Sequence, residues 1–206
     1  ICQALNRYST VKFIGLCHGI DMMRRAVSVA LDMPLEEIDA LAYGINHFSW
    51  VRALRLRGTC EDLYPAFRQA VHERLPELEA AIGHSLKLSG FLMDNYGMWP
   101  LPSDDHVGEY LSYAWELVGM EGYPFDRVDR ESDEFKAEIR KWTSGELPLP
   151  DWALTPSGER AIAIIAGILG NTHQYELAVN LPNHGCIPNL PDDAIVEVPV
   201  IVDADG

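Results

Sequence analysis

The fold is decided by a stretch that opens with F-I-G-L-C-H-G-I-D-M-M at residues 13–23 and closes with Y-G-I-N-H-F-S-W at residues 43–50. Cys17 and His18 follow one short apolar run, and His47 follows another. A thiolate and an imidazole at the ends of two buried elements can converge on one metal ion or on one substrate. The sequence therefore predicts that the functional site of this chain lies where the two apolar runs end.

The local pattern of this stretch predicts alternating strands and a helix. Residues 10–16, T-V-K-F-I-G-L, are β-branched and apolar, which predicts a buried strand ending at Gly15. Apolar residues then recur every three or four positions over 20–33, which predicts a helix with one buried face. Cys17 would lie near the start of that helix, where the dipole favours a thiolate. Residues 39–45 and 50–57 predict two antiparallel strands.

The remaining chain mixes helices and strands without strict βαβ alternation, which predicts an α+β fold. We expect a helix over 62–81 interrupted by Pro65 and Pro76, helices over 86–98, 106–118 and 130–142, loops over 119–129 and 147–156, a buried helix over 159–169, and strands near 176–181 and 194–202. No G-x-G-x-x-G follows a predicted strand, so these residues contain no dinucleotide-binding fingerprint.

Composition excludes several classes of protein. The chain has 206 residues, 48% of them hydrophobic, and a formal net charge of −15, which argues against nucleic acid and against anionic membrane surfaces as partners. No apolar run approaches the roughly 20 residues that span a bilayer. The four cysteines are too few and too scattered for a disulfide scaffold, which favours a reducing, cytoplasmic setting.

The two ends of the sequence suggest a segment of a longer protein. The chain opens at I-C-Q-A-L without an initiator Met and stops at V-D-A-D-G, just after a predicted strand. We therefore expect residues 1–206 to form one α+β catalytic domain that binds metal and substrate and is truncated at both ends.

Five blocks occur in the order known for one enzyme family. They are G-L-C-H-G at 15–19, G-I-N-H-F at 44–48, D-L-Y-P at 62–65, D-H-V-G-E-Y at 105–110 and N-L-P-N-H-G-C-I-P-N-L-P at 180–191. With them the chain resembles the NAD-dependent family-4 glycoside hydrolases over about residues 12–200. It looks most similar to the α-galactosidase-like branch, which also holds α-glucosidases and α-glucuronidases.

The resemblance implies a fold like that of the lactate and malate dehydrogenases. A Rossmann domain would precede Ile1, and this chain would correspond to most of the catalytic domain. The implied reaction cleaves a small α-glycoside by redox-assisted elimination. Hydride passes from the sugar C3 to NAD⁺, a tyrosine removes the acidified C2 proton, the C1–oxygen bond breaks, water adds and the hydride returns. A divalent metal, usually Mn²⁺, binds the C2 and C3 oxygens, and family members are usually homo-oligomers.

The resemblance also implies roles for residues around the two apolar runs. Cys17 and His47 match the metal-ligand positions, where the ion would act as a Lewis acid. Because a thiolate is softer than Mn²⁺ prefers, iron, cobalt or nickel would also suit the site. His18 stands where relatives carry the group that assists the leaving group. Asn46 would orient substrate hydroxyls or the metal surroundings.

A second group of matched residues lies near the D-H-V-G-E-Y block. Tyr96 is the nearest candidate for the tyrosine base, with Tyr110 and Tyr113 as alternatives. His106 and Glu109 share a helical face and would contact the substrate.

Simpler interpretations and other functions stay open. In the simpler interpretation, Cys17 is an ordinary core cysteine and His47 is a turn residue. Turn formation alone would likewise account for the presence of Asn180, Asn183 and Gly185. A 2-hydroxy acid dehydrogenase on the same fold would need an arginine and a His–Asp pair. The third alternative is an inactive fragment or pseudoenzyme, and we expect no turnover from this segment alone. No basic cluster marks a 6-phosphate pocket, which favours a non-phosphorylated sugar, with a uronic or sulfonated sugar as alternatives.

Overall fold

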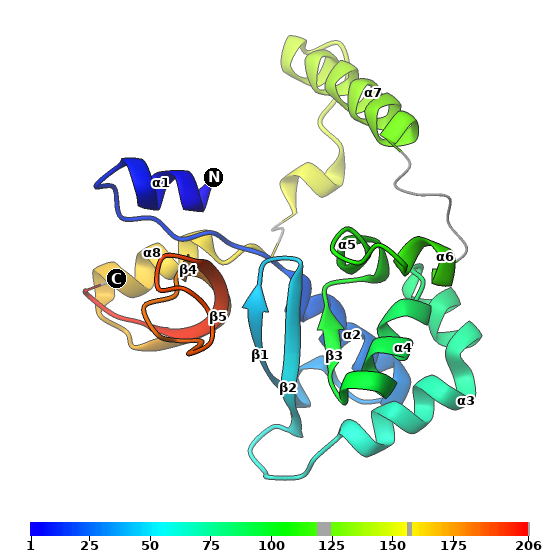
Figure 1. Ribbon diagram of the computed structural model, residues 1–206. Helices are drawn as coiled ribbons and strands as arrows, with labels where there is room; N and C mark the ends of the chain where they lie inside the picture. Colours follow the sequence, from blue (N-terminus) through cyan, green and yellow to red (C-terminus); the bar gives the residue numbers. More distant parts are fainter. Residues whose placement is uncertain (119–124, 156–157, 206) are drawn as a thin grey trace.

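The computed structural model describes residues 1–118, 125–155 and 158–205. Its sheet has five strands in the order β3-β2-β1-β5-β4, and paired neighbours run antiparallel. The strands are β1 Ile38–Ile45, β2 Phe48–Leu56, β3 Trp99–Leu101, β4 Gln174–Pro182 and β5 Ile195–Val202. Figure 1 shows β4 and β5 curling away from the flatter group of β1, β2 and β3. The four predicted strands from 39–45 onward are confirmed, and so is the α+β class.

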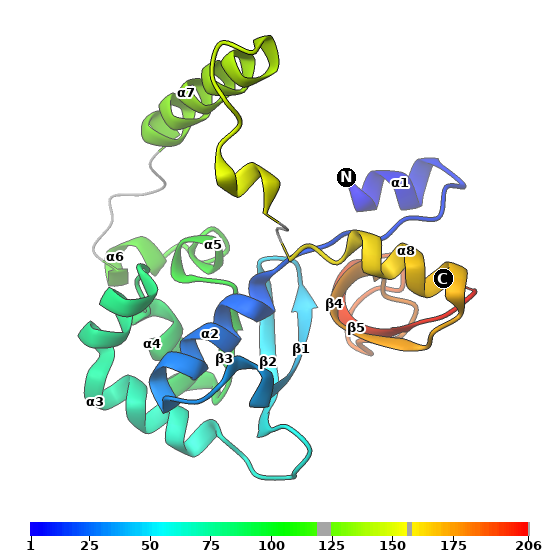
Figure 2. The ribbon, with the colours of Figure 1, turned by 180° about the vertical axis from the view of Figure 1, so that it is seen from behind.

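The described residues also form helices. They are α1 Cys2–Tyr8, α2 Gly19–Leu31, α3 Tyr64–Ile82, α4 Lys87–Tyr96, α5 Asp104–Gly108, α6 Ala114–Val118, α7 Phe125–Ser144 and α8 Ala161–Gly170, with 3-10 turns η1 Leu35–Glu37 and η2 Asp151–Leu154. Seen from behind, α2 crosses β1 and β2 while α3 and α4 lie beside it (Figure 2). In the described part of the chain, no helix combines the length and apolar character needed to cross a bilayer.

Helix α2 supplies the centre of the core. Met23, Val27 and Ala30 recur every three or four residues and are all buried. They join one hydrophobic cluster with side chains of β1, β2 and α3. The helix predicted over 20–33 is therefore confirmed, and its apolar stripe orients the segment that carries Cys17.

The two prolines of α3 have different effects. Pro65 occupies the first turn, where a missing N–H costs nothing, so it starts the helix and does not interrupt it. Pro76 lies inside the helix, and the backbone two residues earlier, at Arg74, leaves helical geometry with φ −132°. The predicted interruption is therefore confirmed at Pro76 only.

The strand predicted over 10–16 is wrong. This segment makes a single bridge, in which Gly15 and Asn180 exchange two backbone hydrogen bonds of 2.8 Å. Val11 and Ile14 are exposed, so apolar character in this run does not reflect burial. Composition predicted a strand, but only one residue of the segment reaches the edge of β4.

Two predicted helices have different boundaries in the structure. The helix predicted over 106–118 is two short helices, α5 and α6, separated by a turn after Gly108. The charged helix over 130–142 is confirmed within α7, but α7 already begins at Phe125, so the loop predicted over 119–129 is wrong for its last residues. The first residues of that predicted loop, 119–124, lie outside the described residues.

The apolar helix α8 is less buried than predicted. Ile164 and Gly167 are its buried residues, whereas the side chains of Ile162 and Leu169 are 76% and 83% exposed. A helix that packs against a single layer buries only one of its faces. When all its faces are apolar, the composition does not show which face is buried. The helix is confirmed, and its predicted general burial is wrong.

Asp104 ties α5 to the start of α4. Its carboxylate accepts hydrogen bonds from the backbone N–H groups of Leu88 and Ser89, both at 2.9 Å, and from the hydroxyls of Ser85 and Ser89 at 2.8 and 2.6 Å. Backbone donors in the first turn of a helix have no partner within the helix, so Asp104 caps α4 from a distance. Asp105 turns instead toward Ser103. Both aspartates belong to the first turn of α5, and their side chains point toward different partners.

We expect Asp104→Ala to lower the free energy of unfolding by about 3 kcal/mol, because four donors lose their acceptor. Asp105→Ala is the matched control and should change it by less than about 1 kcal/mol, since its half-exposed carboxylate is screened by water. Urea denaturation near neutral pH measures both values. Equal losses in the two variants would contradict the capping role.

Candidate functional site

Cys17 lies two residues before α2, at the end of the extended segment that crosses β4. It is half-buried, and burial raises the pKa of its thiol. The backbone N–H of Gly19 and the amide of Asn46 oppose this rise, while the Glu197 carboxylate adds to it. The N–H group at the helix start does lower the pKa, as expected, but burial outweighs it. A cation beside Cys17 would favour its thiolate form.

Asn46 and His47 form the two-residue turn between β1 and β2. Ile45 and Phe48 pair across this hairpin, and His47 has a left-handed φ of 63°. The side chain of Asn46 donates to Glu197 Oε2 at 2.9 Å. A tight hairpin therefore brings Asn46 toward Cys17 and places His47 at its tip.

His47 faces residues from α5 and its C-terminal cap. Its ring meets that of His106 edge-on, with centroids 4.3 Å apart. Burial lowers the pKa of His47, nearby His106 lowers it further, and the carboxylates of Glu109, Glu197 and Asp105 oppose the change. A lowered pKa keeps the imidazole neutral near neutral pH, which is the form that binds metals.

The ring of His106 contacts His47, and the carboxylate of Glu109 interacts with His47 electrostatically. His106 Nδ1 is 3.0 Å from Asp105 Oδ1 and 3.2 Å from Ser103 Oγ, which holds the ring in place. Glu109 is the C-cap residue of α5, and its N–H donates to the His106 carbonyl. The structure therefore brings these two residues to the hairpin tip.

The three candidate tyrosines contact different residues. Tyr110 donates its hydroxyl to the Asn46 carbonyl at 3.0 Å, and its ring stacks on Phe48 at 5.3 Å. Tyr96 ends α4, is 60% exposed and packs against Trp50 at 5.7 Å. Tyr113 lies beside Tyr96. Of the three, Tyr110 is the one whose hydroxyl bonds to the turn that carries His47.

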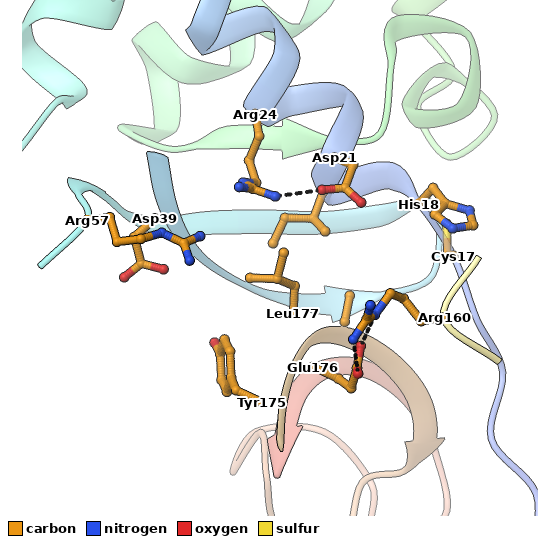
Figure 3. Close-up of a pocket in the computed structure, with 12 residues that line it drawn as sticks. Cys17, His18, Asp21, Arg24, Asp39, Arg57, Arg160, Tyr175, Glu176 and Leu177 are labelled. Carbon is orange, nitrogen blue, oxygen red and sulfur yellow. Dashed lines mark hydrogen bonds and ion pairs between the residues drawn. The ribbon is translucent and has the colours of Figure 1, made fainter. Parts of the chain in front are cut away.

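His18 lies at a pocket on the other side of Cys17. The pocket has a volume of about 440 Å³, and both residues line it, whereas Asn46, His47 and His106 do not. His18 Nδ1 is 3.4 Å from Glu159 Oε1. Figure 3 shows Cys17 and His18 at one edge of this pocket.

Two arginines of the pocket walls pair with acidic side chains. Arg24 binds Asp21 at 2.8 Å, and Arg160 binds Glu176 through two hydrogen bonds of 2.7 and 2.9 Å (Figure 3). The Glu176 pair raises the pKa of Arg160. Asp39 and Arg57 also line the pocket, so its walls are polar and carry equal numbers of acidic and arginine side chains.

Glu197 of β5 is the residue that sequence reasoning missed. It is 3% exposed and accepts hydrogen bonds from Asn46, Ser49 and Asn180. Its strand, I-V-E-V-P-V-I-V, contains no other charged residue. A lone carboxylate in an apolar strand is almost never buried without a partner, and that signal was present in the sequence.

The donor set limits how a metal ion would be held. Among the described residues, no group of three or more His, Cys, Asp or Glu side chains is placed to hold one ion. Cys17 and His47 would supply two donors, a thiolate and a neutral imidazole, and the Glu197 carboxylate interacts electrostatically with each of them. These residues fit a divalent ion whose other positions are filled by water or by substrate oxygens.

The chain is similar to known glycosyl hydrolases. A family model described as "Family 4 glycosyl hydrolase C-terminal domain" matches residues 42–206. The alpha-glucosidase of Erwinia rhapontici is 27% identical over 100% of this chain and 50% of its own length. The alpha-galactosidase of Bacillus subtilis is 28% identical over 97% of this chain and 46% of its own. The chain thus spans about half the length of these curated relatives.

Solved structures show the same fold. A 6-phospho-alpha-glucosidase from gut microorganisms, in complex with NAD and Mn²⁺, superposes with a TM-score of 0.70 at 21% identity, covering 99% of this chain and 48% of that chain. The family model covers most of the present chain, including the β1–β2 turn and β5. This chain therefore belongs to family 4 of the glycosyl hydrolases and corresponds to the C-terminal domain of that family.

Proposed function

We propose that the full-length protein carrying this chain is a glycosidase that depends on NAD and on a divalent metal and cleaves a small α-glycoside. Residues 1–206 would be its α+β catalytic domain, and the protein would work as a homo-oligomer. The observation that carries this proposal is the meeting of Cys17, Asn46 and His47 around one buried carboxylate. Family membership and the NAD- and Mn²⁺-bound relative support it.

Bound NAD would supply reversible oxidation at the sugar, and a bound divalent ion would polarise the substrate oxygens. Cys17 and His47 would hold the ion as a thiolate and a neutral imidazole. Asn46 would orient the substrate, since its amide is already fixed by Glu197. His106 and Glu109 would contact the sugar beside His47.

The proposed reaction needs two proton transfers, one from an acid and one to a base. His18 would protonate the leaving group, and the 440 Å³ pocket that reaches it has the size of a small-ligand site. The base would be a tyrosine. Tyr96 is the candidate predicted from the sequence, but the position of the Tyr110 hydroxyl beside Asn46 favours Tyr110.

The pocket walls favour an uncharged sugar over a phosphorylated one. Arg24 and Arg160 are already engaged with acidic partners, so a phosphate bound to either of them would have to displace an ion pair, and of the arginines that line the pocket Arg57 is the one without such a pair in the described part of the chain. An α-galactoside or α-glucoside requires no such exchange. A uronate, with a single carboxylate, is the second candidate.

The test uses purified full-length protein under reducing conditions with aryl α-galactoside, α-glucoside and α-glucuronide. We expect release of the aryl group from one of them only when both NAD⁺ and Mn²⁺ are present, and loss of activity with a chelator. No NADH should accumulate, because the hydride returns to the sugar. Net NADH from a 2-hydroxy acid would instead support the dehydrogenase, and folded protein without turnover would support the pseudoenzyme.

A further inference from the structure

We propose that Glu197 is a positioning residue for the metal site of Cys17 and His47, acting through Asn46 and through its own negative charge. This inference rests on the proposed function, because it assigns a role toward the ion that Cys17 and His47 would hold. It concerns a residue that the sequence blocks do not include.

The carboxylate of Glu197 is held from three strands or turns. Ser49 of β2 donates its hydroxyl to Oε1 at 2.9 Å. Asn46 of the hairpin turn donates to Oε2 at 2.9 Å, and Asn180 of β4 donates to the same oxygen at 3.3 Å. With 3% exposure, the side chain has no freedom to turn toward water. A carboxylate held in one orientation can in turn fix the orientation of the Asn46 amide that donates to it.

The backbone around Glu197 is equally constrained. Gly44 and Glu197 form the register pair that joins β1 to β5. A Cβ on Gly44 would lie 2.5 Å from the Ser49 Cα and 2.8 Å from the Phe48 carbonyl oxygen, so only glycine permits this close packing of the hairpin. Glu197 therefore lies where β1 meets β5, and it is hydrogen-bonded to the turn that carries His47.

The charge of Glu197 has no cationic side chain beside it. In the described part of the chain, the buried carboxylate of Glu176 pairs with Arg160, whereas the partners of Glu197 are neutral donors. A buried carboxylate is stabilised by hydrogen-bond donors or by a positive charge, and Glu197 has three neutral donors where Asp104 has four. The charge of Glu197 acts on both Cys17 and His47. A divalent ion held by those two residues would therefore also be attracted to Glu197.

Asn180 provides a second, independent sign that a ligand completes this cluster. Its side chain is buried, and Oδ1 has no hydrogen-bond partner among the described residues. Rotating the amide by half a turn would set Oδ1 against the Glu197 carboxylate, so the orientation is fixed by repulsion. Asn180 Oδ1 can therefore accept a hydrogen bond from a donor outside the chain, such as a sugar hydroxyl or water.

The decisive variant is Glu197→Gln in the full-length protein, which keeps the size of the side chain but removes its charge and one acceptor. Titration calorimetry with Mn²⁺ is expected to show affinity weakened about 10- to 100-fold. With Co²⁺ as the probe, the thiolate-to-cobalt absorption band should shift or weaken. Asp104→Asn is the matched control, since it alters another buried carboxylate that caps α4 and should leave both readouts unchanged.

A milder variant guards against failure of Glu197→Gln to fold. Ser49→Ala removes one donor to Oε1 and leaves the charge, so its Mn²⁺ affinity should fall between those of the wild type and Glu197→Gln. Wild-type affinity and an unchanged cobalt band in the folded variants would overturn the role of Glu197. If the wild-type protein bound no Mn²⁺ or Co²⁺, the proposed function itself would fall, and the role of Glu197 with it.

Discussion

Replacing Cys17 by serine in the full-length protein is expected to abolish Mn²⁺ binding and to lower kcat/KM by about three orders of magnitude, the scale of lost Lewis-acid catalysis. Serine keeps the size of the side chain, but its hydroxyl does not ionise near neutral pH and so cannot replace a thiolate ligand. Metal analysis of the purified variant and steady-state kinetics with added Mn²⁺ measure the two effects.

The matched control is Cys60→Ser, because Cys60 is an exposed cysteine in the loop after β2. It should retain metal and activity. A double variant sharpens the test. If Cys17 and His47 hold the same ion, Cys17→Ser combined with His47→Ala should be no slower than either single variant, because either change already removes the ion. Additive losses would contradict a shared metal site.

Tyr110→Phe is expected to lower kcat by about 10²- to 10⁴-fold, the usual range for loss of a general base. The same change should abolish exchange of the sugar C2 proton with deuterated solvent. Tyr96→Phe should lower kcat by less than about threefold, because Tyr96 lies at the far end of a row of rings that runs through Trp50 and Phe48 to Tyr110. Kinetics and proton exchange monitored by NMR distinguish the two residues.

Tyr110 also donates a hydrogen bond to the Asn46 carbonyl, so a structural effect must be separated from a catalytic one. Urea denaturation of Tyr110→Phe should show a loss of about 1 kcal/mol, typical of one neutral hydrogen bond. A large loss of kcat in Tyr96→Phe, with little in Tyr110→Phe, would restore the assignment made from the sequence.

The prediction of the base from sequence depended on the order of residues along the chain. Tyr96 comes just before the D-H-V-G-E-Y block, whereas Tyr110 is the last residue of that block. Which hydroxyl reaches Asn46 depends on how α5 packs against the β1–β2 hairpin. That packing joins segments 64 residues apart, which no local pattern encodes.

Burial was another property that composition could not settle. The helix over 20–33 is amphipathic, and its apolar stripe correctly marked its buried face. Helix α8 is apolar on all sides, so its sequence did not indicate which face packs against the sheet. The apolar run at 10–16 likewise reached β4 at only one residue.

The sequence by itself determined the α+β class, the core helix, the hairpin strands and the family, because these follow from short-range periodicity and from ordered blocks. It also marked Cys17, Asn46, His47, His106 and Glu109, each beside a predicted element end or on a helical face. Only the tertiary structure showed that Glu197 links this cluster, through a hydrogen bond between residues 151 positions apart. The physical reason is that a buried carboxylate is stabilised by whatever donors the fold brings to it, and those donors come from strands that are adjacent only after the sheet has formed.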